Sequence, residues 1–168
     1  GTDTGQEIVL QMLRADGSAA GASTVVADAA ADGTLDLAGG GDGGAVAYGL
    51  VAGGTRPEVR FRAFDADGAL VGGTQVLVGS PEQGRDASIT PLAGGYAVAY
   101  RRIDEASEAT LVVALASATG EVVDELPLAA VSPRGGRTTI EASADGRLLV
   151  AWAEPADEQT RIVAARVR

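Results

Sequence analysis

The sequence repeats with a period of about 52 residues, and this period restricts the architectures that the chain can adopt. Tyr48, Tyr100 and Trp152 each end a short apolar segment, and both intervals between them are 52 residues. A turn marker recurs in a similar phase, in the segments 15–17, 66–68 and 118–120. Two markers with one period predict an array of similar structural units.

Each unit has the pattern of short β-strands. Residues 58–64 alternate polar and apolar side chains, as expected of a half-buried strand. Copies of this strand are expected at residues 7–13, 110–116 and 161–167. The pair Asp67–Gly68 favours a tight hairpin, because both residue types tolerate a positive φ. No window shows apolar residues at helical spacing between capping residues, so the sequence predicts an all-β fold.

The expected fold is a single repeat domain over residues 1–168, built from four-stranded antiparallel units that resemble propeller blades. Three such repeats of about 52 residues are followed by one additional strand. A β-trefoil is the alternative, because it also contains three repeats of four strands. The expected units and the strand copy are residues 7–57, 58–109, 110–160 and 161–168.

The number of units predicts self-association or additional blades. Propeller rings typically contain about four to eight blades, so three blades leave an open arc. Such an arc exposes sheet faces and strand edges. The chain is therefore expected to belong to a longer propeller, to complete a six-bladed ring as two copies, or to be capped in another way. The aromatic residue of each unit is expected to pack between adjacent blades rather than to stack on sugars.

Two segments of the middle repeat carry a family resemblance. Residues 62–78 read RAFDADGALVGGTQVLV, and residues 91–100 read PLAGGYAVAY. They resemble the blade repeats of large secreted bacterial propellers of the RTX and adhesin type. The third repeat departs from this pattern, with Thr119–Gly120 in place of Asp–Gly and Val123–Asp124 in place of Gly–Gly. The resemblance implies secretion or display on a cell surface, and the absence of lysine and asparagine indicates a bacterium with a GC-rich genome.

The composition excludes several functional classes. The chain contains no cysteine and no histidine, which excludes disulfides, zinc fingers, the Ser-His-Asp triad and His-ligated metals. Its formal charge is −10 and its arginines are scattered, so nucleic-acid binding is not expected. Membrane insertion is not expected either, because no long apolar run or basic amphipathic helix is present. Enzymatic activity is not expected, and a mechanism based on carboxylates alone is the one route left open.

The candidate ligand-binding residues lie where the second and third aromatic segments end and in the loops that follow. In a propeller these loops share one face, where acidic side chains could bind a cation or a basic ligand, although solvated surface charge is the simpler interpretation. A second candidate is a calcium site at Asp65 and Asp67, but the early Gly68 favours a hairpin turn, and no cofactor is assigned. The candidate ligand-binding residues are Arg101, Arg102, Asp104, Glu105, Glu108, Glu154, Asp157 and Glu158.

The function expected from these features is a non-catalytic extracellular or surface module for binding and assembly, with a protein or glycan ligand. A trefoil-type lectin is one alternative. The other is a fragment of a carboxylate-dependent glycoside hydrolase. Its acids would come from Asp104, Glu105, Asp157 and Glu158.

Overall fold

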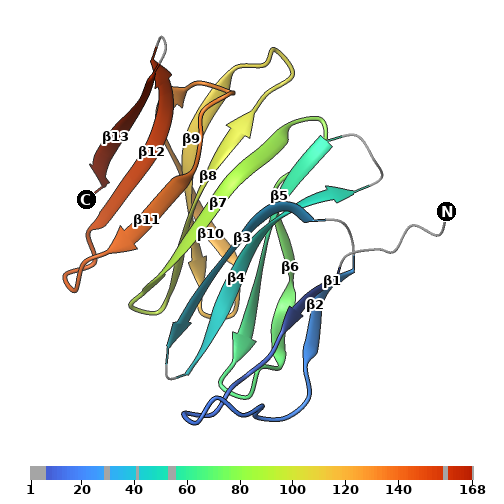
Figure 1. The fold of residues 1–168 in the computed structure, drawn as a ribbon. Helices are drawn as coiled ribbons and strands as arrows, with labels where there is room; N and C mark the ends of the chain where they lie inside the picture. Colours follow the sequence, from blue (N-terminus) through green and yellow to red (C-terminus); the bar gives the residue numbers. More distant parts are fainter. Residues whose placement is uncertain (1–6, 29–30, 41, 53–55, 157–158, 168) are drawn as a thin grey trace, which may run out of the picture.

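The structure is a computed structural model that describes all residues except 1–6, 29–30, 41, 53–55, 157–158 and 168. The described residues form strands joined by turns and no helix, which confirms the predicted all-β class (Figure 1). A helix that could cross a membrane is accordingly not found among them. The strands are β1 (Glu7–Leu10), β2 (Thr24–Asp28), β3 (Ala31–Gly40), β4 (Gly43–Ala52), β5 (Arg56–Asp65), β6 (Leu70–Val78), β7 (Gln83–Leu92), β8 (Gly95–Ile103), β9 (Ala109–Ser117), β10 (Val122–Val131), β11 (Thr138–Ala142), β12 (Leu148–Ala156) and β13 (Gln159–Val167).

The strands form four antiparallel sheets, each made of strands that follow one another in the chain. Sheet I contains β1–β2, sheet II contains β3–β6, sheet III contains β7–β10 and sheet IV contains β11–β13 (Figure 1). Among the described residues, two sheets thus have the four strands expected of a repeat, and the other two have two and three. Each of sheets II to IV combines strands from two neighbouring units of the sequence division.

The first predicted strand is shorter than expected. Residues 7–13 were expected to be one strand, but β1 ends at Leu10. Leu13 forms only an isolated bridge with Ala19, because the chain turns back at Arg14, whose N–H donates to the carbonyl O of Ser18. The turn marker at residues 15–17 therefore closes a small loop instead of a long hairpin.

Two glycines 52 residues apart permit a close backbone approach in sheets II and III. Gly43 begins β4 and Gly95 begins β8. A Cβ at Gly43 would lie 2.3 Å from the carbonyl O of Phe64, and one at Gly95 would lie 2.0 Å from that of Ala116. Only glycine fits where the neighbouring strand comes so near. The repeat therefore preserves a steric requirement of the sheets.

The core lies between the sheets, in three apolar clusters that follow the chain order. Tyr48 packs with the apolar residues of sheet I, Tyr100 with those of sheet II and Trp152 with those of sheet III. Their exposed fractions are 1%, 0% and 6%. The packing role predicted for the three aromatic side chains is confirmed, since each one is buried against the preceding sheet.

Alanines occupy the opposite face of the same strands. Ala47 on β4 belongs to the cluster between sheets II and III, and Ala99 on β8 belongs to the cluster between sheets III and IV. Both are 0% exposed. Small side chains at this position allow the following sheet to approach closely. In β4 and β8, the aromatic side chain thus faces the preceding sheet and the alanine faces the following one.

Candidate functional site

The first strands of sheets II, III and IV, which are edge strands, are joined by side chains that bind the backbone of the next sheet. These strands, β3, β7 and β11, lie side by side (Figure 1). Oδ2 of Asp36 on β3 accepts hydrogen bonds from Ser88 Oγ–H at 2.7 Å and from Ile89 N–H at 2.9 Å. Ser88 Oγ in turn accepts a hydrogen bond from Ile140 N–H on β11 at 3.4 Å. We call this set of contacts the inner seam.

The sequence did not single out the residues of the inner seam. Asp36 and Ser88 are 52 residues apart, and a second bond of the seam joins Thr90 Oγ1 to Ala142 N–H at 3.2 Å, also across 52 residues. Polar residues that recur in phase within apolar strands were the available signal. Such residues are buried only where they find hydrogen-bond partners.

Replacement of Asp36 by alanine is expected to lower the free energy of unfolding by about 2 kcal/mol, because the N–H of Ile89 loses a charged acceptor. The matched control is Asp124→Ala. The Asp124 carboxylate accepts from the next N–H in the chain, as Asp36 also does, and lies on the outer strand β10. We expect this variant to stay within about 0.5 kcal/mol of the parent in urea unfolding. Equal losses in the two variants would show that Asp36 has no special role.

A hollow of about 710 Å³ opens beside the inner seam. Leu35 and Asp36 line it from sheet II, and Ser88 lines it from sheet III. Ala151 and Ile162 line it from sheet IV. The hollow therefore borders the uncovered sides of two sheets and the seam between them, with apolar and polar groups in its wall.

Arg101, one of the predicted ligand-binding residues, lies inside the protein. The residue belongs to strand β8 and not to a loop, and its side chain is 0% exposed. The register of β7 is irregular at Asp86, whose φ is 57°, a conformation that aspartate tolerates. Asp86 Oδ2 lies 2.7 Å from Nη1 of Arg101, which also donates to the carbonyl O of Gly135 at 2.6 Å. This ion pair, between a buried guanidinium and a carboxylate that is 24% exposed, therefore joins β7, β8 and the turn before β11.

Arg102, the next residue, takes part in a more exposed network. Its Nη1 lies 3.5 Å from Oε2 of Glu125, and Tyr100 donates a hydrogen bond to Oε1 of the same carboxylate at 2.6 Å. Burial, reinforced by Glu125, raises the pKa of Tyr100 well above its usual value. The network thus fixes the protonated tyrosine between sheet III and sheet II.

Stability is expected to decline as the pH rises above about 10, the ordinary pKa of tyrosine. The folded state raises the pKa of Tyr100, so this contribution is complete below pH 10 and is lost above it. The loss should approach about 1.4 kcal/mol per pH unit for each such tyrosine. Tyr100→Phe should reduce the slope of unfolding free energy against pH, while the buried Tyr48 and the half-buried Tyr96 retain part of it. An unchanged slope in the variant would contradict this assignment.

The acidic candidates are divided between two hollows. Asp104 and Glu105 line one of about 650 Å³, to which Glu82 also contributes. Asp104 additionally shapes the turn between β8 and β9, where its Oδ1 accepts from the N–H of Glu108 at 2.9 Å. Glu108 itself is exposed. The first group of predicted residues therefore lies together around one turn.

Glu154 lies apart from that group, on β12. It lines a different hollow, of about 360 Å³, together with Arg161. Its Oε2 accepts a hydrogen bond from the N–H of Ser132 at 2.9 Å, whereas its Oε1 is buried without a hydrogen-bond partner among the described residues. The two remaining candidates, Asp157 and Glu158, lie outside the described residues.

Asp65 forms the hairpin that the sequence predicted between β5 and β6. Its Oδ1 accepts from the N–H of Asp67 at 3.0 Å and from that of Ala69 at 2.9 Å, and Gly68 has a φ of 82°. This carboxylate thus stabilises the turn. In the part of the chain that the structure describes, three or more acidic side chains do not gather as a metal-binding group.

The site residues thus fall into an inner seam, a buried ion pair and two separate acidic hollows. Comparisons of the chain with protein-family models, curated proteins and solved structures find no match.

Proposed function

We propose that the chain is a non-catalytic module for binding and assembly, with a propeller-like arrangement of blades. Sheets II and III each contain four consecutive antiparallel strands, as propeller blades do. The sheets pack in chain order, and β3, β7 and β11 lie side by side. In this proposal sheets I and IV are partial blades, and the module is secreted or displayed on a bacterial surface, as the sequence resemblance implies.

One observation supports an assembly function above the others. Leu37 on β3 is 55% exposed, whereas the residues at the same register position of β7 and β11, Ile89 and Ile140, are 5% and 2% exposed. Leu35, also on β3, is 58% exposed. Ile89 and Ile140 are each covered by the preceding sheet, but the two strands of sheet I leave Leu35 and Leu37 uncovered. This face of sheet II is thus suited to another sheet.

A protein partner is favoured over a glycan. Sugar recognition commonly uses exposed aromatic faces, yet Tyr48, Tyr100 and Trp152 are buried between sheets. A glycoside hydrolase receives little support from the described acids, because Asp104 and Glu154 line separate hollows. The uncovered apolar face instead offers main-chain and side-chain contacts to a second β-structure.

Sedimentation equilibrium over a range of chain concentrations tests the proposal. We expect reversible association in the micromolar range, with no binding on a glycan array and no hydrolysis of chromogenic glycosides. A chain that stays monomeric at tens of micromolar would remove the assembly function. Hydrolysis that depends on Asp104 or Glu105 would establish the enzymatic alternative.

A further inference from the structure

We infer that the outer face of sheet IV in one copy of the chain covers β3 of a second copy, in a head-to-tail contact. This inference rests on the proposed assembly function and names its partner and both surfaces. The donor surface consists of Leu35 and Leu37 on β3. The acceptor surface is the side of sheet IV turned away from sheet III, formed by Thr139, Glu141, Leu149, Ala151 and Ile162.

The acceptor surface has the pattern of the faces that are covered inside the chain. Ala47 and Ala99 are 0% exposed because sheets III and IV lie over them. Ala151 follows at the same interval of 52 residues, on a face over which the described residues place no sheet. Beside it, Leu149 is 51% exposed and Ile162 is 71% exposed. Sheet IV therefore repeats a covered face without its cover.

The hydrogen-bonding groups at the two surfaces match those that join β3, β7 and β11 within one copy. Asp36 accepts from Ile89 N–H and Ser88 accepts from Ile140 N–H, each from the next inner strand. Thr139 is opposite Ala151 as Ser88 is opposite Ala99, so Thr139 holds the acceptor position of sheet IV. The matching donor position on β3 is the N–H of Leu37, which is now bonded to Oδ1 of its own Asp36 at 2.9 Å. The contact would exchange this local bond for one across the interface.

A second position shows that donors and acceptors are matched. Thr90 accepts from Ala142 N–H across sheets III and IV. Across sheets II and III, the acceptor position is occupied by Ala38, and the donor position by Pro91, which has no N–H. At the uncovered ends, the corresponding residues are Glu141, with an exposed carboxylate, and Gly39, with an N–H. Glu141 and Gly39 therefore offer one acceptor and one N–H donor, as Thr90 and Ala142 do.

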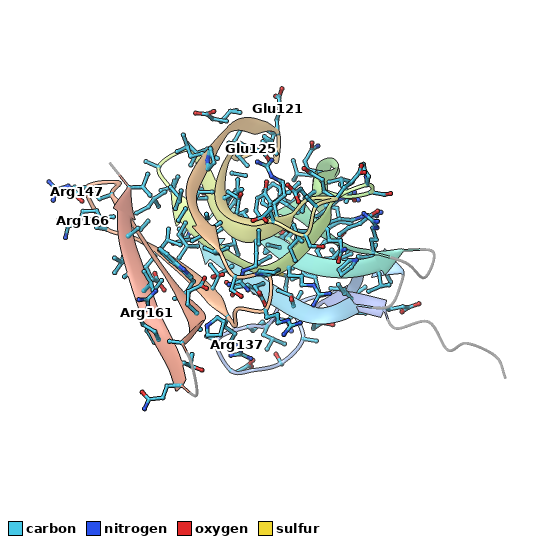
Figure 2. All side chains as sticks on the ribbon, turned by 90° about the horizontal axis from the view of Figure 1, so that it is seen from above. Glu121, Glu125, Arg137, Arg147, Arg161 and Arg166 are labelled. Carbon is cyan, nitrogen blue, oxygen red and sulfur yellow. The ribbon has the colours of Figure 1, made fainter. Side chains whose placement is uncertain are left out.

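The charges of the two ends are also complementary. Residues 1–55 contain seven acidic residues and one arginine, whereas residues 132–168 contain six arginines and five acidic residues. Arg147 and Arg166 lie on the side of sheet IV that is turned away from sheet III (Figure 2). With a net charge of −6 in the first segment and +1 in the second, contact between two N-terminal segments is less favourable than contact between unlike ends.

The strand inventory agrees with two copies that close on each other. A four-stranded blade formed by both copies would receive two strands from sheet I and three from sheet IV of the second copy. β1 and β13 would then compete for the same position in that blade. β13 is paired with β12 over nine residues, whereas β1 is paired with β2 over four, with an irregular register. We expect β1 to leave this position. Each copy carries both surfaces, and both surfaces border its 710 Å³ hollow. Two such contacts between two copies would therefore close a ring around the hollows.

The test uses two single variants and their mixture. Leu37→Arg places a cation on the donor surface, and Ala151→Arg places a long side chain where a sheet must lie close. Both residues lie on uncovered faces, so both variants should fold. Each variant alone should be monomeric at tens of micromolar by sedimentation. A mixture of the two should form a heterodimer, because one intact donor surface then meets one intact acceptor surface.

The control is Val123→Arg, since Val123 on β10 is 65% exposed and lies on neither surface. It should associate like the parent chain. If the parent associates but the two variants do so equally well, the head-to-tail contact is wrong and the assembly function stands. If one variant is monomeric and the other still associates, the contact joins like surfaces and the inference fails. If the mixture of two monomeric variants stays monomeric, the inference fails as well. A monomeric parent would remove both proposals.

Discussion

Asp86→Ala is expected to lower the free energy of unfolding by about 4 kcal/mol. Its carboxylate is the charged partner of Arg101, whose side chain is 0% exposed. Removal of one member of a buried ion pair leaves the other charge without compensation, which typically costs about 3–5 kcal/mol. The Nε and Nη2 groups of Arg101 already lack partners among the described residues, so little else can neutralise the guanidinium. Urea or thermal unfolding measures the loss.

The double variant Asp86→Ala/Arg101→Met separates this charge effect from backbone strain. Alanine at a φ of 57° is strained in the single and the double variant alike. The double variant should recover at least half of the loss, because methionine fills the space without a charge. Arg147→Ala is the surface control, since its ion pair with Asp145 is more than half exposed, and it should change stability by less than about 0.5 kcal/mol. A double variant no more stable than Asp86→Ala would refute the role of the ion pair.

Phe61→Ala is expected to cost about 4 kcal/mol, because it opens a cavity between sheets II and III. Phe61 is 0% exposed, and its ring centre lies 5.8 Å from that of Tyr96. The control is Val76→Ala on the adjacent strand β6, where the side chain is 53% exposed and the loss should stay within about 0.5 kcal/mol. A loss below about 1 kcal/mol for Phe61→Ala would mean that the two sheets are not packed as described.

Local patterns predicted the individual strands well, because strand alternation and turn residues act over a few neighbours. The strand expected at residues 58–64 lies within β5, and the hairpin at Asp67–Gly68 is present. The expected strand at residues 7–13 was too long, since alternation does not report the turn that begins at Arg14. The grouping of strands into sheets depends on which consecutive strands pair and which do not, and alternation does not encode that choice.

The candidate site was harder to predict, because burial depends on tertiary contacts. Arg101 and Arg102 are adjacent and chemically identical in the sequence. In the structure Arg101 is buried because the irregular register at Asp86 presents a carboxylate to it, whereas Arg102 extends toward Glu125 near the surface. The inner seam was missed for the same reason, since Asp36 resembles any other acid in a Gly-rich segment until β7 lies beside it.

The order of strands within the sheets has a consequence for how the chain acquires its structure. Every described strand pair in a sheet joins consecutive strands, so each of sheets II to IV can close through short connections before its neighbours exist. Stability then grows by nearest-neighbour packing, as in a stack. Amide hydrogens of sheet III, which is covered on both faces, should therefore exchange with solvent most slowly, while those of the terminal sheets open first. The terminal sheets would thus adapt to a partner while sheet III remains folded.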